Sequence, residues 1–356
     1  MKRRLAQLGL AAAIGVLGVV AAWLALSPHG AGEPPAAQVS VLFATNRDLI
    51  DNGAPAGRFG GRRDALRYGE CTVGYRPLPL TRDLARSVNF FVPTDVREIE
   101  AVSVLDRGAF EHELGKRGDG PVVLFVHGYA YGFPRTCWVG AELQRMVGDD
   151  ATIVMFGWPS DGNPADYVAD RADVEWSVPD LAGLIDRLGG SVGPGRLRLL
   201  AHSLGTRGVL AALDELALAG REPPYAGHLV LLAPDFDTAR FRHRYDRLER
   251  QVERITLYAS RNDTPLLVSE TLHGHPRLGQ AGDHLTVIDG MTTIDVSPLG
   301  RYHPSGHEYF FYHPIAADDL VESLLRGTPP ERRRHARERA LDGKRYWVLV
   351  KPGAQP

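Results

Sequence analysis

Short runs of apolar residues alternate with longer segments of helical spacing along the central part of the chain. The apolar runs, rich in Val, Ile, Leu and Phe, occupy residues 122–126, 152–156, 197–200, 228–233, 255–259 and 285–288. Apolar residues recur every three or four positions between some of these runs, at residues 136–147, 178–188 and 206–218. Wholly apolar strands that alternate with helices are typical of a mostly parallel sheet covered on both faces. The pattern therefore predicts an α/β fold.

The two flanks of this block have different patterns. Residues 39–44 predict a first strand, and residues 71–75, 89–92 and 98–105 indicate further short strands. The residues from 48 to 67 are rich in Gly, Arg and Asp and predict an exposed loop. Beyond residue 327 the chain is dominated by Arg and Glu up to residue 339, and residues 346–350 are apolar. This end predicts a solvated helix followed by an edge strand or a docking tail.

One junction carries a chemical signal. The stretch LRLLAHSLGTRGVL at residues 197–210 predicts a buried strand, a tight corner centred on Ser203 and a helix. A serine on such a corner is raised from the end of a sheet, and small residues two positions to either side let strand and helix pack closely. Gly205 and Ala201 occupy those positions, with Ala201 in place of the more usual glycine. A serine between a strand and a helix is also a common N-cap, so the corner alone leaves both interpretations open.

The N-terminus predicts a membrane address. Lys2, Arg3 and Arg4 precede an uncharged stretch at residues 5–27, which is long enough to span a bilayer as a helix. Basic residues on its N-terminal side predict that this end stays in the cytoplasm. A cleaved signal peptide is the alternative, although the residues after the stretch make poor cleavage sites. We therefore expect an inner-membrane anchor with the globular part on the periplasmic side, or a secreted protein if the segment is removed.

Composition narrows the classes of partner. The 41 Lys and Arg residues nearly balance the 43 Asp and Glu residues, and the net charge of −2 gives no reason to expect nucleic-acid binding. Two cysteines, Cys71 and Cys137, are too few for a disulfide framework or a thiolate metal site, and they could pair with each other in an exported domain. We divide the chain into an anchor or signal at residues 1–27, a Gly-, Ala- and Pro-rich linker at 28–38, a globular domain at 39–326 and a charged extension at 327–356.

Seven motifs in a fixed order carry a resemblance to a known family. They are VLFATNR from Val41 to Arg47, VVLFVHGY, FGWPSDG, LLAHSLGTRG, LLAPDFD, LYASRNDTPL and GHEYF. In this order they resemble the bacterial α/β-hydrolases of the esterase/lipase superfamily whose function is uncharacterised. The resemblance extends over residues 39–325. It implies an α/β-hydrolase fold, with a mostly parallel sheet between two layers of helices, and a Ser-His-Asp triad, but it supplies no substrate.

The resemblance orders the candidates for that triad. In this fold the nucleophile is followed along the chain by the acid and then by the histidine. With Ser203 as nucleophile, the Asn-Asp pair after the run at 255–259 makes Asp263 the expected acid, and Asp235 the alternative. The GHEYF motif makes His307 the expected general base, and His303 the alternative.

Two main-chain N–H groups should bind the oxyanion. One is expected at Leu204, directly after the nucleophile, and the other at Tyr129 in the loop after residues 122–126, with Ala130 as the alternative. A single metal ion held by His127, His202 and Asp235 is a further alternative, although no closely spaced ligand motif supports it. We expect no cofactor. Arg47 is expected to anchor loops rather than bind substrate.

The leading hypothesis is a membrane-anchored serine hydrolase that cleaves a carboxylic ester of a small molecule or a lipid through an acyl-enzyme. An acyltransferase would use the same triad and differ only in the nucleophile that enters the site. A non-catalytic binding or envelope scaffold would need none of the three residues. All three are present in the required order, which favours an enzyme.

Overall fold

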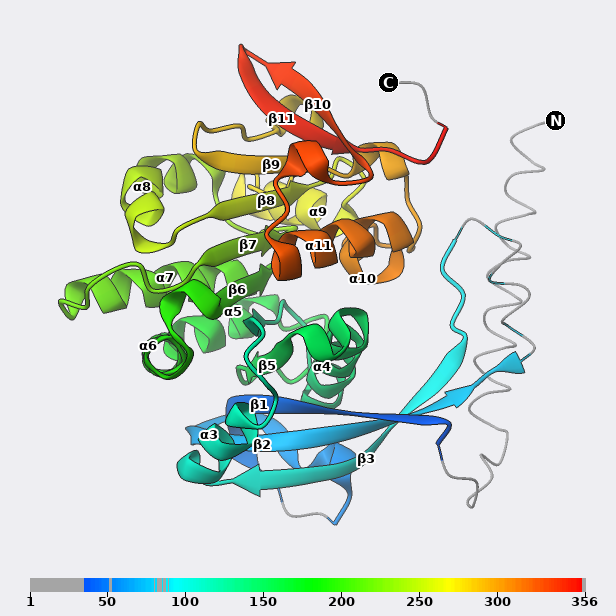
Figure 1. Ribbon diagram of the computed structural model, residues 1–356, viewed down its shortest axis with the longest axis vertical. Coiled ribbons are helices and arrows are strands. Elements are labelled where there is room, and N and C mark those ends of the chain that lie inside the picture. The colour runs from blue at the N-terminus through cyan, green and yellow to red at the C-terminus, as the bar shows by residue number, and fades with distance from the viewer. Residues whose placement is uncertain are drawn as a thin grey trace. The chain divides into compact units, whose positions relative to one another are not determined.

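The computed structural model describes residues 35–353 apart from 51–52, 80, 82–84, 86–87 and 89, and within that range a single sheet runs through the molecule (Figure 1). Its order is β10-β11-β9-β8-β7-β6-β4-β5-β1-β2-β3. The strands are β1 (Ala37–Leu49), β2 (Phe59–Pro77), β3 (Asp95–Leu105), β4 (Val122–Val126), β5 (Thr152–Gly157), β6 (Leu197–His202), β7 (His228–Leu232), β8 (Ile255–Ala259), β9 (Met291–Asp295), β10 (Ala336–Leu341) and β11 (Lys344–Leu349).

The centre of the sheet is parallel and its two ends are antiparallel. Every neighbouring pair from β11 through to β1 is parallel. The hairpin β10–β11 closes one end, and the strands β1, β2 and β3 form an antiparallel ribbon at the other. Parallel strands bring their carboxyl ends to one edge, so the loops after β4, β6, β7 and β8 meet there.

Helices cover both faces of the sheet. They are α3 (Arg107–Gly115), α4 (Phe133–Val147), α5 (Tyr167–Trp176), α6 (Val178–Val192), α7 (Gly205–Leu218), α8 (Thr238–Gln251), α9 (Thr264–His273), α10 (Tyr309–Tyr312) and α11 (Pro314–Arg326). Successive side chains of a strand point to opposite faces of the sheet, so strands made wholly of apolar residues give the sheet two apolar faces. In β4, Leu124 faces the core beneath α6 and α7, whereas Val123 and Phe125 face the core beneath α4 and α11.

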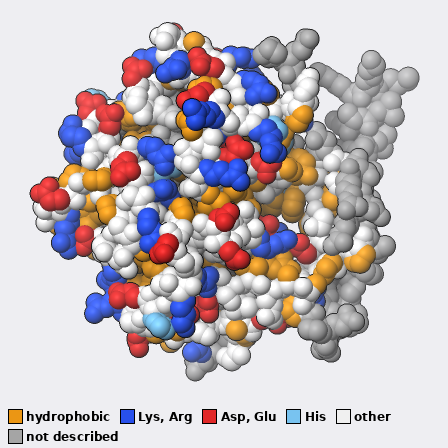
Figure 2. Space-filling model, in the orientation of Figure 1, with side chains coloured by type: hydrophobic (Ala, Val, Ile, Leu, Met, Phe, Trp, Pro, Cys, Tyr) orange, Lys and Arg blue, Asp and Glu red, His pale blue; other side chains and the backbone are white. Residues whose placement is uncertain are grey.

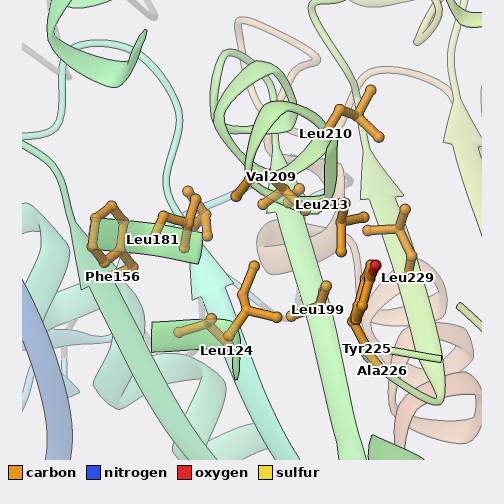
Figure 3. Close-up of a cluster of buried hydrophobic side chains, with 14 of the residues drawn as sticks. Leu124, Phe156, Leu181, Leu199, Val209, Leu210, Leu213, Tyr225, Ala226 and Leu229 are labelled. Atoms are coloured by element: carbon orange, nitrogen blue, oxygen red, sulfur yellow. The ribbon is translucent and has the colours of Figure 1, made fainter. Parts of the chain in front are cut away.

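The first of these cores shows how the pattern of helical spacing is used. Figure 3 shows Val209, Leu210 and Leu213 of α7 packed over Leu199 of β6 and Leu229 of β7. All five side chains are fully buried. The apolar runs at 122–126, 152–156, 197–200, 228–233 and 255–259 thus become strands at the expected places, and the predicted α/β class is confirmed.

Four expectations about local structure are wrong. Residues 48–67 were expected to form a loop, but β1 and β2 extend through most of that segment, and its polarity comes from exposed ion pairs such as Arg62–Asp48. Residues 285–288 are buried irregular chain, and the strand follows at β9. Residues 329–339 hold a short 3-10 turn and β10 instead of a helix. Phe91 and Val92 also lie outside any strand.

The predicted membrane anchor lies outside the described residues and stays a prediction. No helix in the described part of the chain is both long and apolar enough to cross a membrane. The domain boundaries at 27, 38 and 326 also stay predictions. Positive and negative side chains are interspersed over the face seen in Figure 2, as the balanced composition leads one to expect.

Candidate active site

Ser203 lies on the corner between β6 and α7 and has a left-handed backbone conformation, with φ of +52°. A non-glycine residue rarely adopts this conformation, and here main-chain hydrogen bonds hold it on both sides. Ser203 N donates to Leu232 O at 2.9 Å, and Asp235 N donates to Ser203 O at 3.1 Å. The N-cap of α7 is Leu204, and no side chain caps the helix, so the N-cap interpretation of Ser203 does not apply.

Glycines allow the corner to pack closely against the loop after β4. A Cβ atom on Gly205 would lie 2.6 Å from Val126 O, and a Cβ atom on Gly128 would lie 2.9 Å from Ser203 Cβ. Neither clash could be relieved without moving the main chain. The two glycines therefore fix the separation between Ser203 and the loop at residues 128–131.

Asp263 and His307 contact each other directly. Asp263 follows β8 and caps α9, where its carboxylate accepts from Leu266 N at 3.0 Å. His307 lies in the loop before α10, and its Nδ1 is 2.7 Å from Asp263 Oδ2. Both side chains are nearly or fully buried. The contact leaves His307 Nε2 as the ring nitrogen that is free to exchange a proton.

Burial and charge act on this pair in opposite directions. Burial lowers the pKa of His307, but the adjacent Asp263 carboxylate and its hydrogen bond outweigh burial, so the pKa of His307 lies above its ordinary value. Burial raises the pKa of the Asp263 carboxyl group, and the contact with His307 works against that rise. The pair therefore favours the protonated imidazole more than an isolated histidine would.

Asp235, the alternative acid, has other partners. Its carboxylate accepts from Arg277 Nε at 2.7 Å, from Ser269 Oγ at 2.6 Å and from Tyr167 Oη at 2.7 Å. Burial alone would raise the pKa of Asp235, but the Arg277 charge and these hydrogen bonds outweigh it and lower the pKa. With both oxygens engaged, Asp235 does not orient a histidine. Sequence reasoning missed Arg277, because a charged residue in an irregular segment gives no sign of burial.

The loop after β4 is held by a buried polar network. Ala130 has φ of +56° and its N–H donates to Asp170 Oδ2 at 2.8 Å, while Tyr131 N donates to Ser160 Oγ at 3.1 Å. Ser160 Oγ in turn donates to Asp170 Oδ2 at 2.9 Å. Burial raises the pKa of Asp170 to about 6, although its hydrogen bonds oppose that rise.

This network decides which N–H groups remain free. Ala130 N is engaged by Asp170, which removes the alternative donor named in the sequence analysis. Within the part of the chain that the structure describes, the main-chain N–H groups of Tyr129 and Leu204 have no acceptor. Both groups flank Ser203, one in the loop after β4 and one directly after the serine.

Arg47 anchors loops through carbonyl groups. Its guanidinium is fully buried and donates to Tyr131 O at 2.6 Å, to Gly60 O at 3.1 Å and to Ser160 O. Burial lowers the pKa of Arg47 to about 10, which still leaves the side chain charged at neutral pH. The VLFATNR and FGWPSDG motifs, which are far apart in sequence, therefore both help to hold the loop at residues 128–131 in place.

The histidines of the motifs differ in their surroundings. His127 is stacked between Tyr131 and Trp158, and its Nδ1 is 2.8 Å from Gly128 O. His202 lies with its ring centroid 4.7 Å from that of His307, and neither of its ring nitrogens has a partner among the described residues. Burial lowers the pKa of both His127 and His202, so both are neutral. His303 pairs with Ser305 Oγ at 3.0 Å rather than with an acid.

A cavity of about 620 Å³ opens at this edge of the sheet. Most of its walls are apolar or aromatic, and Ser203, His202 and His307 are part of its lining. The remaining lining residues are Tyr129, Ala130, Tyr131, Arg135, Pro164, Tyr167, Asp235, Thr264, Pro265, Leu266, Val268, Ser269, Leu272, His303, Pro304, Ser305 and Glu308.

No group of three or more His, Cys, Asp or Glu side chains in residues 35–353, as far as these are described, is arranged to hold a metal ion. Cys71 and Cys137 are buried free thiols.

Comparison with solved structures gives distant likenesses. A hyperthermophilic esterase from the archaeon Pyrobaculum calidifontis is 15% identical, with a TM-score of 0.33 over 58% of this chain and 76% of that one. EstE1, a thermostable carboxylesterase from a metagenomic library, is 12% identical, with a TM-score of 0.35 over 82% and 88%. The thioesterase RedJ from the prodiginine pathway of Streptomyces coelicolor is 15% identical, with a TM-score of 0.32 over 58% and 89%. These likenesses are too distant to indicate an activity.

Comparison by sequence gives the family. No curated protein matches the chain. A family model described as "Alpha/beta hydrolase of unknown function (DUF900)" matches residues 105–324, which is more than half of the 356 residues and includes every strand from β4 to β9. The resemblance stated from the seven motifs is thereby confirmed. The chain belongs to this family of alpha/beta hydrolases of unknown function.

Proposed function

We propose that the protein is a serine hydrolase that cleaves a carboxylic ester through an acyl-enzyme, with Ser203 as nucleophile, His307 as general base and Asp263 as its orienting acid. The observation that carries the proposal is the 2.7 Å contact between His307 Nδ1 and Asp263 Oδ2, because it orients a histidine that lines the same cavity as Ser203. The positive φ of Ser203 and the free N–H groups of Tyr129 and Leu204 support it.

The chemistry follows from these positions. His307 Nε2 takes the hydroxyl proton of Ser203 as Oγ bonds to the ester carbonyl carbon, and Asp263 stabilises the imidazolium that forms. The N–H groups of Tyr129 and Leu204 donate to the oxyanion. The imidazolium then protonates the departing alkoxide, and the ester C–O bond breaks to leave the acyl group on Ser203. Water repeats the sequence and releases the acid.

The first test is labelling with a fluorophosphonate, followed by peptide mapping of the modified residue. We expect modification at Ser203, with loss of the label in Ser203→Ala and in His307→Ala. Ser269→Ala is the matched control, because Ser269 also lines the cavity but its hydroxyl is bonded to Asp235. A folded protein that is not labelled, or is labelled equally in Ser203→Ala, would refute the proposal and favour a binding scaffold.

Hydrolysis and acyl transfer are then separated by the acceptor. A hydrolase and an acyltransferase would both be labelled at Ser203, so labelling cannot distinguish them. The experiment therefore compares the products of an ester in water with the products in the presence of an added alcohol. We expect free acid as the main product. A dominant transesterified product would identify the protein as an acyltransferase that uses the same residues.

A further inference from the structure

One face of α9 forms a wall of the cavity and leads away from the reacting groups. Thr264, Val268 and Leu272 are spaced four residues apart, so they lie on one face of the helix, and all three line the cavity. At about 1.5 Å per residue this row extends for about 12 Å. The row starts next to Asp263, which caps the helix, and ends at the surface.

Another part of the cavity lining is aromatic. Tyr129 and Tyr167 line the cavity and pack edge to face, with ring centroids 5.4 Å apart. The hydroxyl of Tyr129 donates to Pro164 O, and the hydroxyl of Tyr167 donates to Asp235 at 2.7 Å. Because both hydroxyl groups already have acceptors within the protein, what the rings offer to a ligand is mainly hydrocarbon surface.

The charged groups of the cavity are neutralised in pairs. Asp235 is bonded to Arg277 at 2.7 Å, and Glu308 is bonded to Arg135 at 2.7 Å. Ser269 Oγ also lies in the lining, and it donates to Asp235. Among the described lining residues, every Arg, Asp and Glu side chain therefore has a partner of opposite charge. The pairing removes the net charge with which these groups could attract a charged substrate.

Two apolar side chains at the outer end of the row remain exposed. Val268 is 63% exposed and Leu272 is 64% exposed, although both line the cavity. A ligand that covers exposed apolar residues at the rim of a cavity removes apolar surface from water, which favours its binding. Leu267, directly before Val268 in sequence, is 46% exposed but does not line the cavity.

We propose that the part of the cavity lined by the α9 row (Thr264, Val268 and Leu272) and by the Tyr129–Tyr167 pair, called the channel from here on, binds a linear, uncharged hydrocarbon chain of the ester substrate. This inference rests on the proposed function and names the substrate class of that site. The chain runs from the ester at Ser203 along α9 and covers Val268 and Leu272 at the rim.

The first experiment measures kcat/KM for p-nitrophenyl acetate and p-nitrophenyl octanoate. The inference predicts that the wild type prefers octanoate, and that Leu272→Glu lowers kcat/KM for octanoate by roughly tenfold or more while acetate changes little. Leu267→Glu places the same charge on the same helix outside the cavity and should keep the preference. A wild type without a preference, or equal effects of the two variants, would overturn the inference.

A second substrate series decides which half of the ester carries the chain. Methyl octanoate and octyl acetate differ only in whether the hydrocarbon is on the acyl or the alcohol side. A preference for either one that Leu272→Glu abolishes supports the channel and assigns its occupant. If both esters are cleaved equally and neither rate responds to Leu272→Glu, no hydrocarbon chain lies in the channel.

Binding is tested separately from catalysis. In Ser203→Ala, calorimetry with 2-decanone, an uncharged ketone that the site cannot hydrolyse, measures occupancy of the channel alone. We expect binding that weakens by roughly tenfold when Leu272→Glu is added and is unchanged when Leu267→Glu is added. Absence of 2-decanone binding would overturn this inference whether or not esters are hydrolysed. Binding without ester hydrolysis in the wild type would instead refute the proposed function and keep the channel.

Discussion

Two buried aspartates at the same edge of the sheet have opposite surroundings. Asp235 follows β7 and Asp263 follows β8, so the fold delivers both to the carboxyl ends of neighbouring parallel strands. Asp235 is 3% exposed and Asp263 is 1% exposed. The pKa of Asp235 is lowered, because the charge and hydrogen bonds of its partners outweigh burial, whereas burial keeps the pKa of Asp263 raised.

The difference lies in the partner. Arg277 carries a permanent charge, so its pair with Asp235 is a fixed structural tie. His307 can lose its proton, so its pair with Asp263 has two states that differ by one proton on the imidazole. An aspartate at the end of β7 thus stabilises the structure, whereas an aspartate at the end of the neighbouring strand β8 belongs to a pair that can take part in proton transfer.

Replacing each aspartate by asparagine tests this contrast most strongly. Asp263→Asn should lower kcat by about 10⁴-fold, because an amide neither stabilises the imidazolium nor keeps its tautomer. Asp235→Asn should lower kcat far less, because Asp235 does not contact His307. Steady-state kinetics with one ester measure both variants, and circular dichroism checks that each is folded. Equal losses of kcat in two folded variants would mean that Asp235 and Asp263 do not have separate roles.

Stability should respond in the reverse order. Asp235→Ala leaves Arg277, which is 2% exposed, as an unpaired buried cation, and we expect it to lower the free energy of unfolding by about 3–5 kcal/mol. Asp263→Ala should cost less, because His307 can become neutral when its partner is removed. Urea denaturation of the two variants measures the difference.

A double variant provides the control for that experiment. In Asp235→Ala with Arg277→Met no charge is left buried, so part of the lost stability should return. If the double variant is less stable than Asp235→Ala alone, the cost comes from lost packing rather than from the unpaired charge.

These contrasts show where sequence was informative. The strands and the corner at Ser203 could be predicted, because both depend on local sequence pattern. Asp263 and His307 were found through motifs and do meet in the fold. Arg277 and Asp170 could not be found in this way. Asp170 stands among Asp166 and Asp173 on a polar segment, and only the tertiary fold buries one of the three.

Asp170 offers a third case, in which a buried aspartate holds main-chain and hydroxyl groups rather than a cation. Asp170→Ala removes the acceptor of Ala130 N and Ser160 Oγ and should let the Tyr129 N–H drift from the oxyanion position. We expect kcat to fall roughly tenfold to a hundredfold with KM little changed. Asp173→Ala is the matched control, because Asp173 lies on the same helix and its carboxylate pairs with Arg63 near the surface. A fall in kcat of equal size in both variants would exclude this positioning role.

The smallest expected effect is a difference between two pH profiles. The pKa of His307 is raised, and its neutral form is the base, so kcat/KM should fall on acidification with a midpoint above about 6.5. The same shift contributes stability that is complete below the unfolded pKa and lost as the pH rises through the folded pKa. Asp235, whose pKa is lowered, contributes stability above an unfolded pKa of about 3.9 that is lost only as the pH falls through its folded pKa. Between pH 8 and 5, therefore, acid should reduce activity without reducing the stability that these two groups supply.

Asp170 is the group that complicates this profile, because its pKa of about 6 lies in the same range. If His307 sets the acid limb of kcat/KM, Asp170→Ala should lower the plateau and leave the midpoint in place. If protonation of Asp170 sets it by releasing the loop at residues 128–131, the variant should lose the limb altogether. Parallel measurements of kcat/KM and of urea stability from pH 5 to 8, in the wild type and in Asp170→Ala, separate the two causes. An unchanged midpoint would assign the titration to the His307–Asp263 pair. In that pair, a histidine that can lose its proton makes a buried carboxylate useful for catalysis.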